Sequence, residues 1–240
     1  MLVAVERLTT LTLFRYPKSA RAWALVAMGR HRGALARTPG LLFWRLLGCG
    51  VGPAFSLEPD LERYALLAVW ETPAAADAFL DDSPCMRAQR ARAVEEWTVR
   101  LSPAVAHGSW GGENPFLPTT ARLRPGRPLA VITRATLRLG AMRSFWRSAH
   151  VATEALSRAE GCLASVGIGE LPFVRLGTFS LWRSDEDVRR YAYGAAAHRQ
   201  AMKARAAGRW YREELFARFV PLSSTGTWDG RDPLRGAGGV

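Results

Sequence analysis

Cysteine is scarce in this sequence of 240 residues. Only Cys49, Cys85 and Cys162 are present, an odd number, and none of them belongs to a C-x-x-C motif. This excludes a disulfide framework, a zinc ribbon and an iron–sulfur site of the usual spacing, and it is typical of reduced thiols in the cytoplasm. We therefore expect all three cysteines to be core residues.

Long apolar runs are also missing. No stretch approaches the ~18 uninterrupted apolar residues that a transmembrane helix needs. The apolar start, MLVAVERLTTLTLFRYP, is interrupted by Glu6 and Arg7, with no basic region before it and no small-residue cleavage site after it. The sequence thus predicts a cytoplasmic protein.

Several common catalytic motifs are absent. The sequence has no H-E-x-x-H, no histidine pair at i and i+4, no convincingly spaced 2-His-1-carboxylate group and no G-x-S-x-G elbow. The run G-x-G-x-G at 48–52 resembles part of a dinucleotide fingerprint, but a strand pattern follows it where that motif needs a helix. We expect these glycines to adopt turn conformations with positive φ.

Acidic residues are fewer than basic ones. The formal net charge of +12 suits nucleic acid, an anionic membrane face or an acidic protein. The arginines are spread singly along helical patterns, as at Arg30, Arg32 and Arg37, which is typical of a solvated surface, so we expect no nucleic-acid partner. With 48% hydrophobic residues the chain folds into a globular protein.

Two halves of the sequence match one another. The motif W-x-G-x-x-P occurs at 110–115 and again at 228–233, an offset of 118 residues, and the same offset aligns EEWTVRLSP with EELFARFVP. GCGVGP at 48–53 matches GIGELP at 167–172, and Arg15 matches Arg134. The match predicts a tandem duplication.

Each half has the same predicted order of elements, β-α-β-β-α-β. The first half has strands near 8–16, 41–47, 64–70 and 98–106 and a helix over 19–36, and the second has strands near 129–137, 163–168, 173–182 and 216–222 and a helix over 141–158. We predict an α+β fold of two ferredoxin-like repeats, 1–120 and 126–234, packed as a dimeric α/β barrel in a single chain, with a disordered tail at 235–240. Two sheets that bury their open faces against each other would enclose an apolar pocket.

The duplicated W-x-G-x-x-P motif is more simply structural than catalytic. An aromatic ring, a turn glycine and a chain-stopping proline predict a clasp that packs the end of each half on its own core. The matched histidines, His31 and His150, are predicted to be structural or on helix surfaces. His107 has no matching histidine in the second half.

His198 breaks the symmetry of the two halves, because its counterpart is Met86. In the segment YGAAAHRQAMKA, a helix that resumes after Gly194 would place Ala195, His198 and Met202 on one face, and Tyr191 joins them if the break is mild. A neutral imidazole facing an apolar cavity is what haem iron uses as a proximal ligand. A buried histidine bonded to the backbone is the alternative.

Two resemblances to known families follow from longer stretches. WETPAAADAFLDDSPCMRAQ at 70–89 looks like the strand–helix segment of antibiotic-biosynthesis-type monooxygenases, whose dimeric α/β barrels also include haem enzymes. From about 10 to 234 the sequence resembles the spheroidene monooxygenase family, the acyclic-carotenoid 2-ketolases. The stretches that carry this second resemblance are FWRLLGCGVG, LLAVW, SWGGENPF, ITRAT, VGIGELPFVRLGTFSLW, AHRQAMKA, WYREELFARF and TWDG.

This resemblance implies an enzyme with haem b that uses O2 and external electrons to oxidise the C-2 position of a linear carotenoid. It implies His198 as the axial ligand. Such an enzyme would need a barrel interior, lined by Ile132, Phe179 and Leu181, to accept the hydrophobic substrate. It would also need cations at the rim for the haem propionates, for which the candidates are Arg134, Arg175 and Arg205.

The basic surface would suit an acidic ferredoxin-type electron donor or peripheral contact with anionic lipid at the inner face of the membrane. Other chemistry on the same fold stays open. The alternatives are peroxidase- or dehydratase-type haem chemistry on a small molecule, a non-catalytic haem- or lipid-binding protein, and a cofactor-free monooxygenase.

Overall fold

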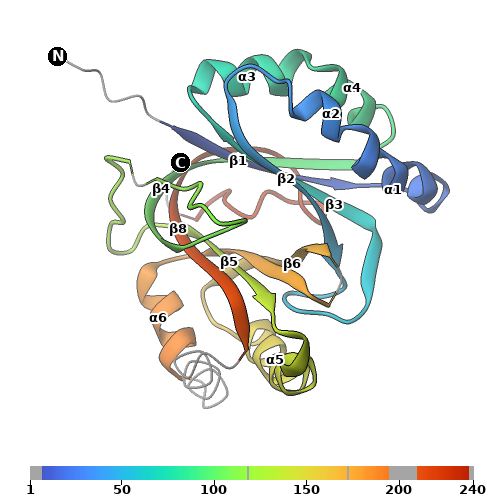
Figure 1. Ribbon diagram of the computed structural model, residues 1–240. Helices are drawn as coiled ribbons and strands as arrows, with labels where there is room; N and C mark the ends of the chain where they lie inside the picture. Colours follow the sequence, from blue (N-terminus) through green and yellow to red (C-terminus); the bar gives the residue numbers. More distant parts are fainter. Residues whose placement is uncertain (1–6, 118, 172, 195–209, 238–240) are drawn as a thin grey trace.

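Eight long strands dominate the architecture (Figure 1). The computed structural model describes residues 7–117, 119–171, 173–194 and 210–237. The elements of the first half are β1 (Leu8–Arg15), η1 (Lys18–Ala20), α1 (Arg21–Arg30), α2 (Arg32–Leu35), β2 (Leu41–Gly50), β3 (Pro59–Trp70), α3 (Pro73–Asp82), α4 (Pro84–Arg90) and β4 (Glu95–Gly108). Those of the second half are β5 (Leu129–Leu137), η2 (Leu139–Ala141), α5 (Met142–Ser157), β6 (Cys162–Leu171), β7 (Arg175–Trp182), α6 (Asp185–Gly194) and β8 (Tyr211–Gly226).

The strands close into one antiparallel barrel in the order β1-β3-β2-β6-β7-β5-β8-β4. The two places where the halves meet differ greatly. At one, β4 and β8 pair continuously from Trp97↔Gly226 to Gly108↔Leu215, with two register shifts. At the other, β2 and β6 pair only through Gly48↔Gly169 and Cys49↔Ile168, and we call this short junction the seam.

The strands of each half follow the same spatial order, which reads 4-1-3-2 within the half. The registers also correspond, because Trp70 pairs with the first residue of β1 and Trp182 with the first residue of β5. The predicted α+β class and the predicted strands are confirmed. Their closure produces a complete barrel, which removes the exposed sheet edges that invite aggregation.

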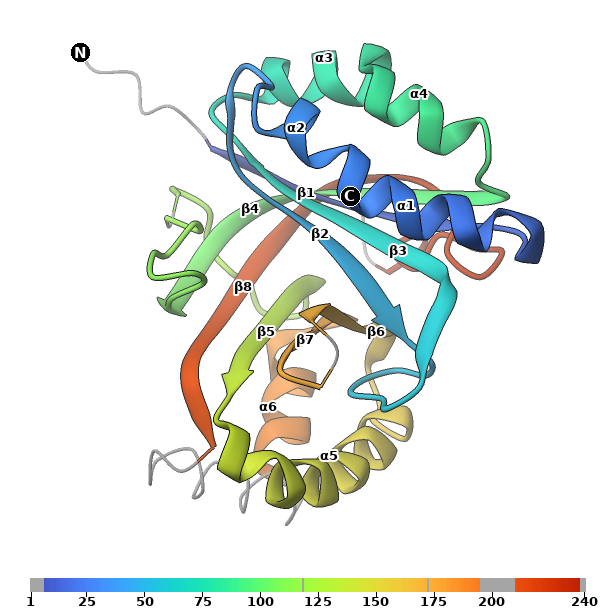
Figure 2. The same cartoon turned by 45° about the vertical axis from the view of Figure 1, so that its right-hand side comes forward.

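The helices lie on the outside of the barrel (Figures 1 and 2), with α1–α4 over the strands of the first half and α5 and α6 beside those of the second. The predicted helix start at Pro84 is confirmed, since the Ser83 hydroxyl accepts a hydrogen bond from the Met86 amide and Pro84 takes the first helical position. Thr72 caps α3 in the same way through the Ala75 amide. Within the described ranges, no helix combines the length and the apolar character needed to cross a membrane.

The barrel interior is filled with side chains. Trp97, Trp110, Phe116 and Trp228 lie inside it, and all are at most 6% exposed. The prediction of a substrate chamber lined by Ile132, Phe179 and Leu181 is therefore wrong, because these three side chains are 0% exposed within this aromatic packing. Interiors packed at this density leave few voids larger than a water molecule.

The last described residues lead from the barrel interior into a turn. Leu234 is 4% exposed and belongs to the packed barrel interior. The amides of Arg235 and Ala237 donate to the carbonyls of Asp232 and Leu234, so the described part of the predicted disordered tail forms a turn.

Candidate functional site

An apolar pocket of about 370 Å³ lies at the seam on the outside of the barrel. Its floor is formed by β2 and β6 where they pair. Its walls come from both halves, because α1 contributes Leu25 and Met28, the β2–β3 connection contributes Phe55 and Leu57, and α5 contributes Trp146. Figure 2 shows the β2–β3 connection between α1 and α5.

Glycines keep the floor of this seam pocket free of side chains. Gly48 and Gly50 of β2 and Gly167 and Gly169 of β6 all line it. The prediction that the first run of glycines adopts positive φ holds only for Gly52, at φ +93°, because Gly48 and Gly50 have ordinary strand conformations. Because they have no side chains, these glycines leave space for the pocket on the outer face of the two paired strands.

The β2–β3 connection is held tightly against the second half. A Cβ atom at Gly167 would lie 2.0 Å from the Ala54 carbonyl oxygen, so only glycine permits this approach. The Thr153 hydroxyl on α5 donates to the Phe55 carbonyl at 3.1 Å, and the Phe55 and Phe145 rings are 5.4 Å apart. This wall of the pocket is therefore fixed by the other half of the chain.

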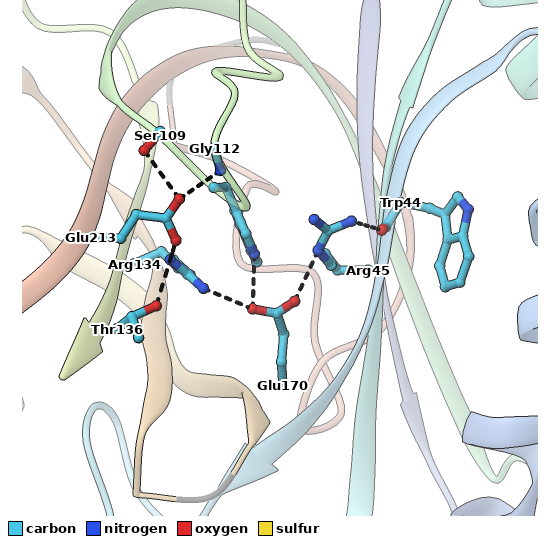
Figure 3. A network of polar contacts seen from close by, with 9 residues as sticks. Trp44, Arg45, Ser109, Gly112, Arg134, Thr136, Glu170 and Glu213 are labelled. Atoms are coloured by element: carbon cyan, nitrogen blue, oxygen red, sulfur yellow. Dashed lines mark hydrogen bonds and ion pairs between the residues drawn. The ribbon is translucent and has the colours of Figure 1, made fainter. Parts of the chain in front are cut away.

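A network of ion pairs around the buried Arg134 includes one residue of the pocket lining, and Figure 3 shows its members. Glu170, which lines the pocket, accepts from Arg45 Nε at 2.9 Å, from Trp110 Nε1 at 2.9 Å and from Arg134 at 3.2 Å. The Arg134 side chain is 5% exposed and also forms an ion pair with Glu213. Two carboxylates facing one buried guanidinium satisfy the rule that buried charges are paired.

Glu213 connects this network to the first clasp. Its Oε1 accepts from the Ser109 hydroxyl at 3.1 Å and from the Gly112 amide at 2.8 Å. Partial burial acts to raise the pKa of Glu213, but the hydrogen bonds from Gly112 and Arg134 and the Arg134 charge outweigh it, and the pKa is lowered from its ordinary value. The carboxylate is therefore ionised across the neutral range.

The second clasp has a matching arrangement. Glu95 of β4 accepts from the Thr227 hydroxyl at 3.0 Å and from the Gly230 amide at 2.7 Å. Each W-x-G-x-x-P segment is thus held by the first glutamate of the Glu-Glu pair in the opposite half. The structure agrees with the predicted structural role. Each clasp packs on its own half, since Trp110 lies 5.6 Å from Phe43 and Trp228 lies 6.3 Å from Phe179, and it is also bonded to the other half, which was not predicted.

Of the residues predicted to bind haem, Tyr191, Arg134 and Arg175 lie in the described part of the chain. Tyr191 packs its ring 5.3 Å from that of Trp182, and burial raises the pKa of its phenol to about 12. Arg134 lies inside the ion network, and this burial between two carboxylates removes the argument for it as a rim cation. Arg175 lines the seam pocket, is exposed, and has no ion pair with any described residue.

The other four, Ala195, His198, Met202 and Arg205, lie outside the described residues. Among the matched histidines, His31 ends α1 with its ring 6.4 Å from that of Trp23, consistent with a structural position. The side chain of His150 is outside the described set, and His107 is exposed on β4. Cys49 and Cys85 are buried as expected, whereas Cys162 is half-buried.

A haem needs an apolar cavity, cations for its propionates and an axial ligand for its iron. The pocket has a mainly apolar wall and the exposed side chain of Arg175 at its rim. These features suit an apolar group that carries acceptors. Cys49 and Tyr64 also line the pocket, and burial raises the pKa of both side chains, which disfavours the anionic forms that bind iron.

No cluster of three or more His, Cys, Asp or Glu side chains able to hold a metal ion occurs in the described ranges. The axial ligand predicted from the sequence, His198, lies outside these ranges and stays a prediction.

Sequence reasoning missed Glu170, Arg45 and Trp146. The signal for Glu170 was present, because the aligned segments GCGVGP and GIGELP place it opposite Val51. Glu170 is charged and its counterpart in the other half is not. The same kind of difference between the halves singled out His198, whose counterpart is Met86. Arg45 and Trp146 carry no comparable signal, since arginine and tryptophan occur throughout the chain.

Comparisons with known proteins agree with this architecture. A scan against protein-family models gives no match. A solved structure of an aldoxime dehydratase superimposes with a TM-score of 0.58 at 12% identity, covering 90% of this chain and 81% of that one. At this identity the likeness concerns the fold alone.

Curated relatives are much more similar in sequence. The chain is 34% identical to spheroidene monooxygenase of Rhodobacter capsulatus over 94% of both chains. It is 34% identical to spheroidene monooxygenase of Cereibacter sphaeroides, covering 94% of this chain and 70% of that one, and 35% identical to that of Rubrivivax gelatinosus, covering 92% and 84%. At this identity over nearly its whole length, the chain belongs to the spheroidene monooxygenase family.

Proposed function

We propose that this protein is a haem-dependent monooxygenase that oxidises the C-2 position of an acyclic carotenoid with O2 and external electrons. The observation that carries the proposal is the 34% identity to a named spheroidene monooxygenase across 94% of both chains. The seam pocket supports it, because its apolar lining suits a hydrocarbon substrate. We also propose that the two halves are tandem copies, for which the shared strand order is the support.

The described residues would bind and position the substrate. Leu25, Met28 and Trp146 would contact the apolar chain and exclude water from it. The β2–β3 connection is fixed by α5 and β6, so the pocket wall is preorganised in the free protein. Glu170 is held by three donors, which keeps this carboxylate fixed at the pocket wall.

Haem, when bound, would supply the activation of O2. His198 is the proposed iron ligand and Arg175 the proposed partner of a propionate. Arg175 is suited to this because its guanidinium is exposed at the pocket rim and forms no ion pair within the described ranges. An acidic ferredoxin-type protein is the proposed electron donor for a chain of net charge +12.

An absorption spectrum tests the haem assignment. Protein supplied with haem is expected to show a Soret band, and His198→Ala is expected to lose or shift it while far-UV circular dichroism shows an intact fold. His107→Ala, at an exposed histidine, is the matched control and should leave the band unchanged. A wild type that stays colourless after haem addition would contradict the haem assignment.

A second experiment tests the reaction. Reduced wild-type protein is expected to incorporate oxygen from labelled O2 into an acyclic carotenoid, whereas peroxidase or dehydratase chemistry would leave the label out of the product. Haem binding without any O2-dependent product would indicate a binding protein, and turnover without Soret absorption would indicate a cofactor-free monooxygenase.

A further inference from the structure

Exposed apolar side chains gather around the mouth of the seam pocket. Leu25 on α1 is 62% exposed, Leu57 in the β2–β3 connection 58%, Leu171 at the end of β6 49% and Phe173 in the β6–β7 turn 43%. All four line the pocket. Single exposed apolar residues need no explanation, but a group that encircles an apolar cavity is typical of an interaction site.

Phe173 is held in place at a conformational cost. Its φ of +67° is a left-handed conformation that bulky L-residues rarely adopt. Its ring lies 6.3 Å from that of Trp146 on α5. The turn therefore presents a large aromatic side chain at the mouth where glycine or asparagine would be the less strained choice.

The pocket is small for an acyclic carotenoid, the substrate class proposed above, and the inference that follows rests on that proposed function. A volume of about 370 Å³ lies near the lower end of the ~300–1,000 Å³ typical of small-molecule sites. The filled barrel interior offers no extension. A long linear hydrocarbon could place one end in the pocket, and the remainder would pass through the apolar mouth.

The helix that contributes Trp146 to the pocket also carries exposed cationic side chains. Arg143 and Arg147 lie on α5 within one turn of Trp146, are exposed, and form no ion pair with any described residue. Two acidic side chains are also near, Glu58 at the end of the β2–β3 connection and Asp60 in β3, and the exposed Arg175 in the pocket lining adds a third cation to oppose them. With a net charge of +12 for the whole chain, the basic character favours an anionic surface.

We infer that the mouth of the seam pocket docks on an anionic lipid bilayer. Leu25, Leu57, Leu171 and Phe173 insert among the acyl chains, and the arginines of α5 contact the headgroups. One end of the hydrophobic substrate enters the pocket while the rest of it stays in the bilayer. The apolar mouth and the flanking arginines correspond to the two signals, burial and charge, by which peripheral proteins bind membranes.

Vesicle sedimentation tests this inference without haem or substrate, so its outcome is separate from that of the proposed function. Full-length protein is expected to sediment with vesicles of phosphatidylcholine and phosphatidylglycerol, and more weakly with phosphatidylcholine alone. Leu57→Gln combined with Leu171→Gln should bind about tenfold more weakly, since burial of apolar side chains is lost. Phe173→Asn should also weaken binding, and asparagine tolerates the positive φ of that turn.

Leu222→Gln is the matched control, because Leu222 is 49% exposed, as Leu171 is, but does not line the pocket. It should bind as the wild type does. Arg143→Gln combined with Arg147→Gln should reduce the dependence of binding on salt. Wild-type protein that sediments with neither vesicle, or a Leu222→Gln variant as impaired as the mouth variants, would overturn the inference.

Discussion

At the scale of single residues, the ion network explains how a charged group can lie inside the chain. Arg134 is 5% exposed, and its guanidinium faces Glu170 from β6 and Glu213 from β8. Glu213 in turn fixes Ser109 and Gly112 of the first clasp. One carboxylate therefore connects a buried cation to the loop that places Trp110 in the barrel interior.

The variant Glu213→Gln tests this connection. Loss of the charged acceptor is expected to lower the free energy of unfolding by about 1.5–3 kcal/mol at neutral pH. The pKa of Glu213 is lowered in the folded state, so its contribution is complete above the unfolded pKa of about 4.3 and is lost as the pH falls through the folded value. The wild type should therefore lose stability below about pH 4.3 more steeply than the variant.

Denaturant titrations between neutral and acidic pH provide the measurement. Glu154→Gln is the control, because Glu154 is half-exposed and its one ion pair within the described ranges is with Arg158, the residue that caps the end of α5. Identical pH slopes for Glu213→Gln and the wild type would show that Glu213 contributes no proton-linked stability.

At the scale of elements, the barrel has one strong and one weak junction between its halves. The β4–β8 ladder is long, and a glycine at each end lets the two strands pass close together. A Cβ atom at Gly108 would lie 2.1 Å from the Glu214 carbonyl oxygen, and one at Gly226 would lie 2.0 Å from the Glu96 carbonyl oxygen. At the seam, pairing ends after two residue pairs. The pocket lies over this short paired stretch, where the glycines of β2 and β6 leave room for a ligand.

The substitution Gly48→Val tests the seam pocket. A Cβ atom at Gly48 would have its nearest neighbour at 3.9 Å, so valine fits the strand and occupies pocket volume instead of clashing with the backbone. We expect unfolding stability to stay near that of the wild type and the affinity for a linear hydrocarbon probe to fall about tenfold or more. Fluorescence quenching by the probe measures the affinity.

Two further glycines give the comparison its controls. Gly140→Val has open space around its Cβ and lies outside the pocket, so probe binding should be unchanged. Gly167→Val should unfold readily because of the Ala54 carbonyl. If Gly48→Val binds the probe as the wild type does, the hydrocarbon site lies elsewhere.

The order of elements was predictable because strands and helices follow from local patterns that occur twice. Matching Trp70 with Trp182 correctly aligned β3 with β7. Partners in space were not predictable in the same way. The sequence match between Glu95 and Glu213 predicts that both have the same role. It does not predict that each accepts hydrogen bonds from the clasp of the opposite half.

The site was predicted less well, for a related reason. Ile132, Phe179 and Leu181 were correctly expected to face inward, but whether an interior is hollow depends on the side chains that enter it from loops. Trp110 and Trp228 enter from the two clasps and fill the space. Arg134 has the same sequence context as its exposed counterpart Arg15, and only the three-dimensional positions of Glu170 and Glu213 distinguish the two.

At the scale of the whole molecule, the two halves share one hydrophobic interior. Trp228 of the second clasp lies 5.4 Å from Trp97 on β4 and 6.3 Å from Phe179 on β7. Trp97 Nε1 donates to Asp232 at 3.0 Å, and Asp229 pairs with Arg15 and Arg63. The C-terminal segment therefore packs largely against the first half of the chain, although it follows the last strand of the second.

This shared interior predicts that the protein unfolds in a single transition although its two halves have the same strand order. Trp228→Ala should lower the free energy of unfolding by about 3–5 kcal/mol, as expected for removing a buried aromatic side chain. Because Trp228 contacts strands of both halves, the whole transition should move to lower denaturant concentration, with far-UV circular dichroism and tryptophan fluorescence still coinciding. Leu222→Ala, at a half-exposed position on β8, should shift the midpoint little. If Trp228→Ala instead produced two separate transitions, of which only one moved, the halves would be independent folding units. The two clasps would then contribute little to holding the halves together.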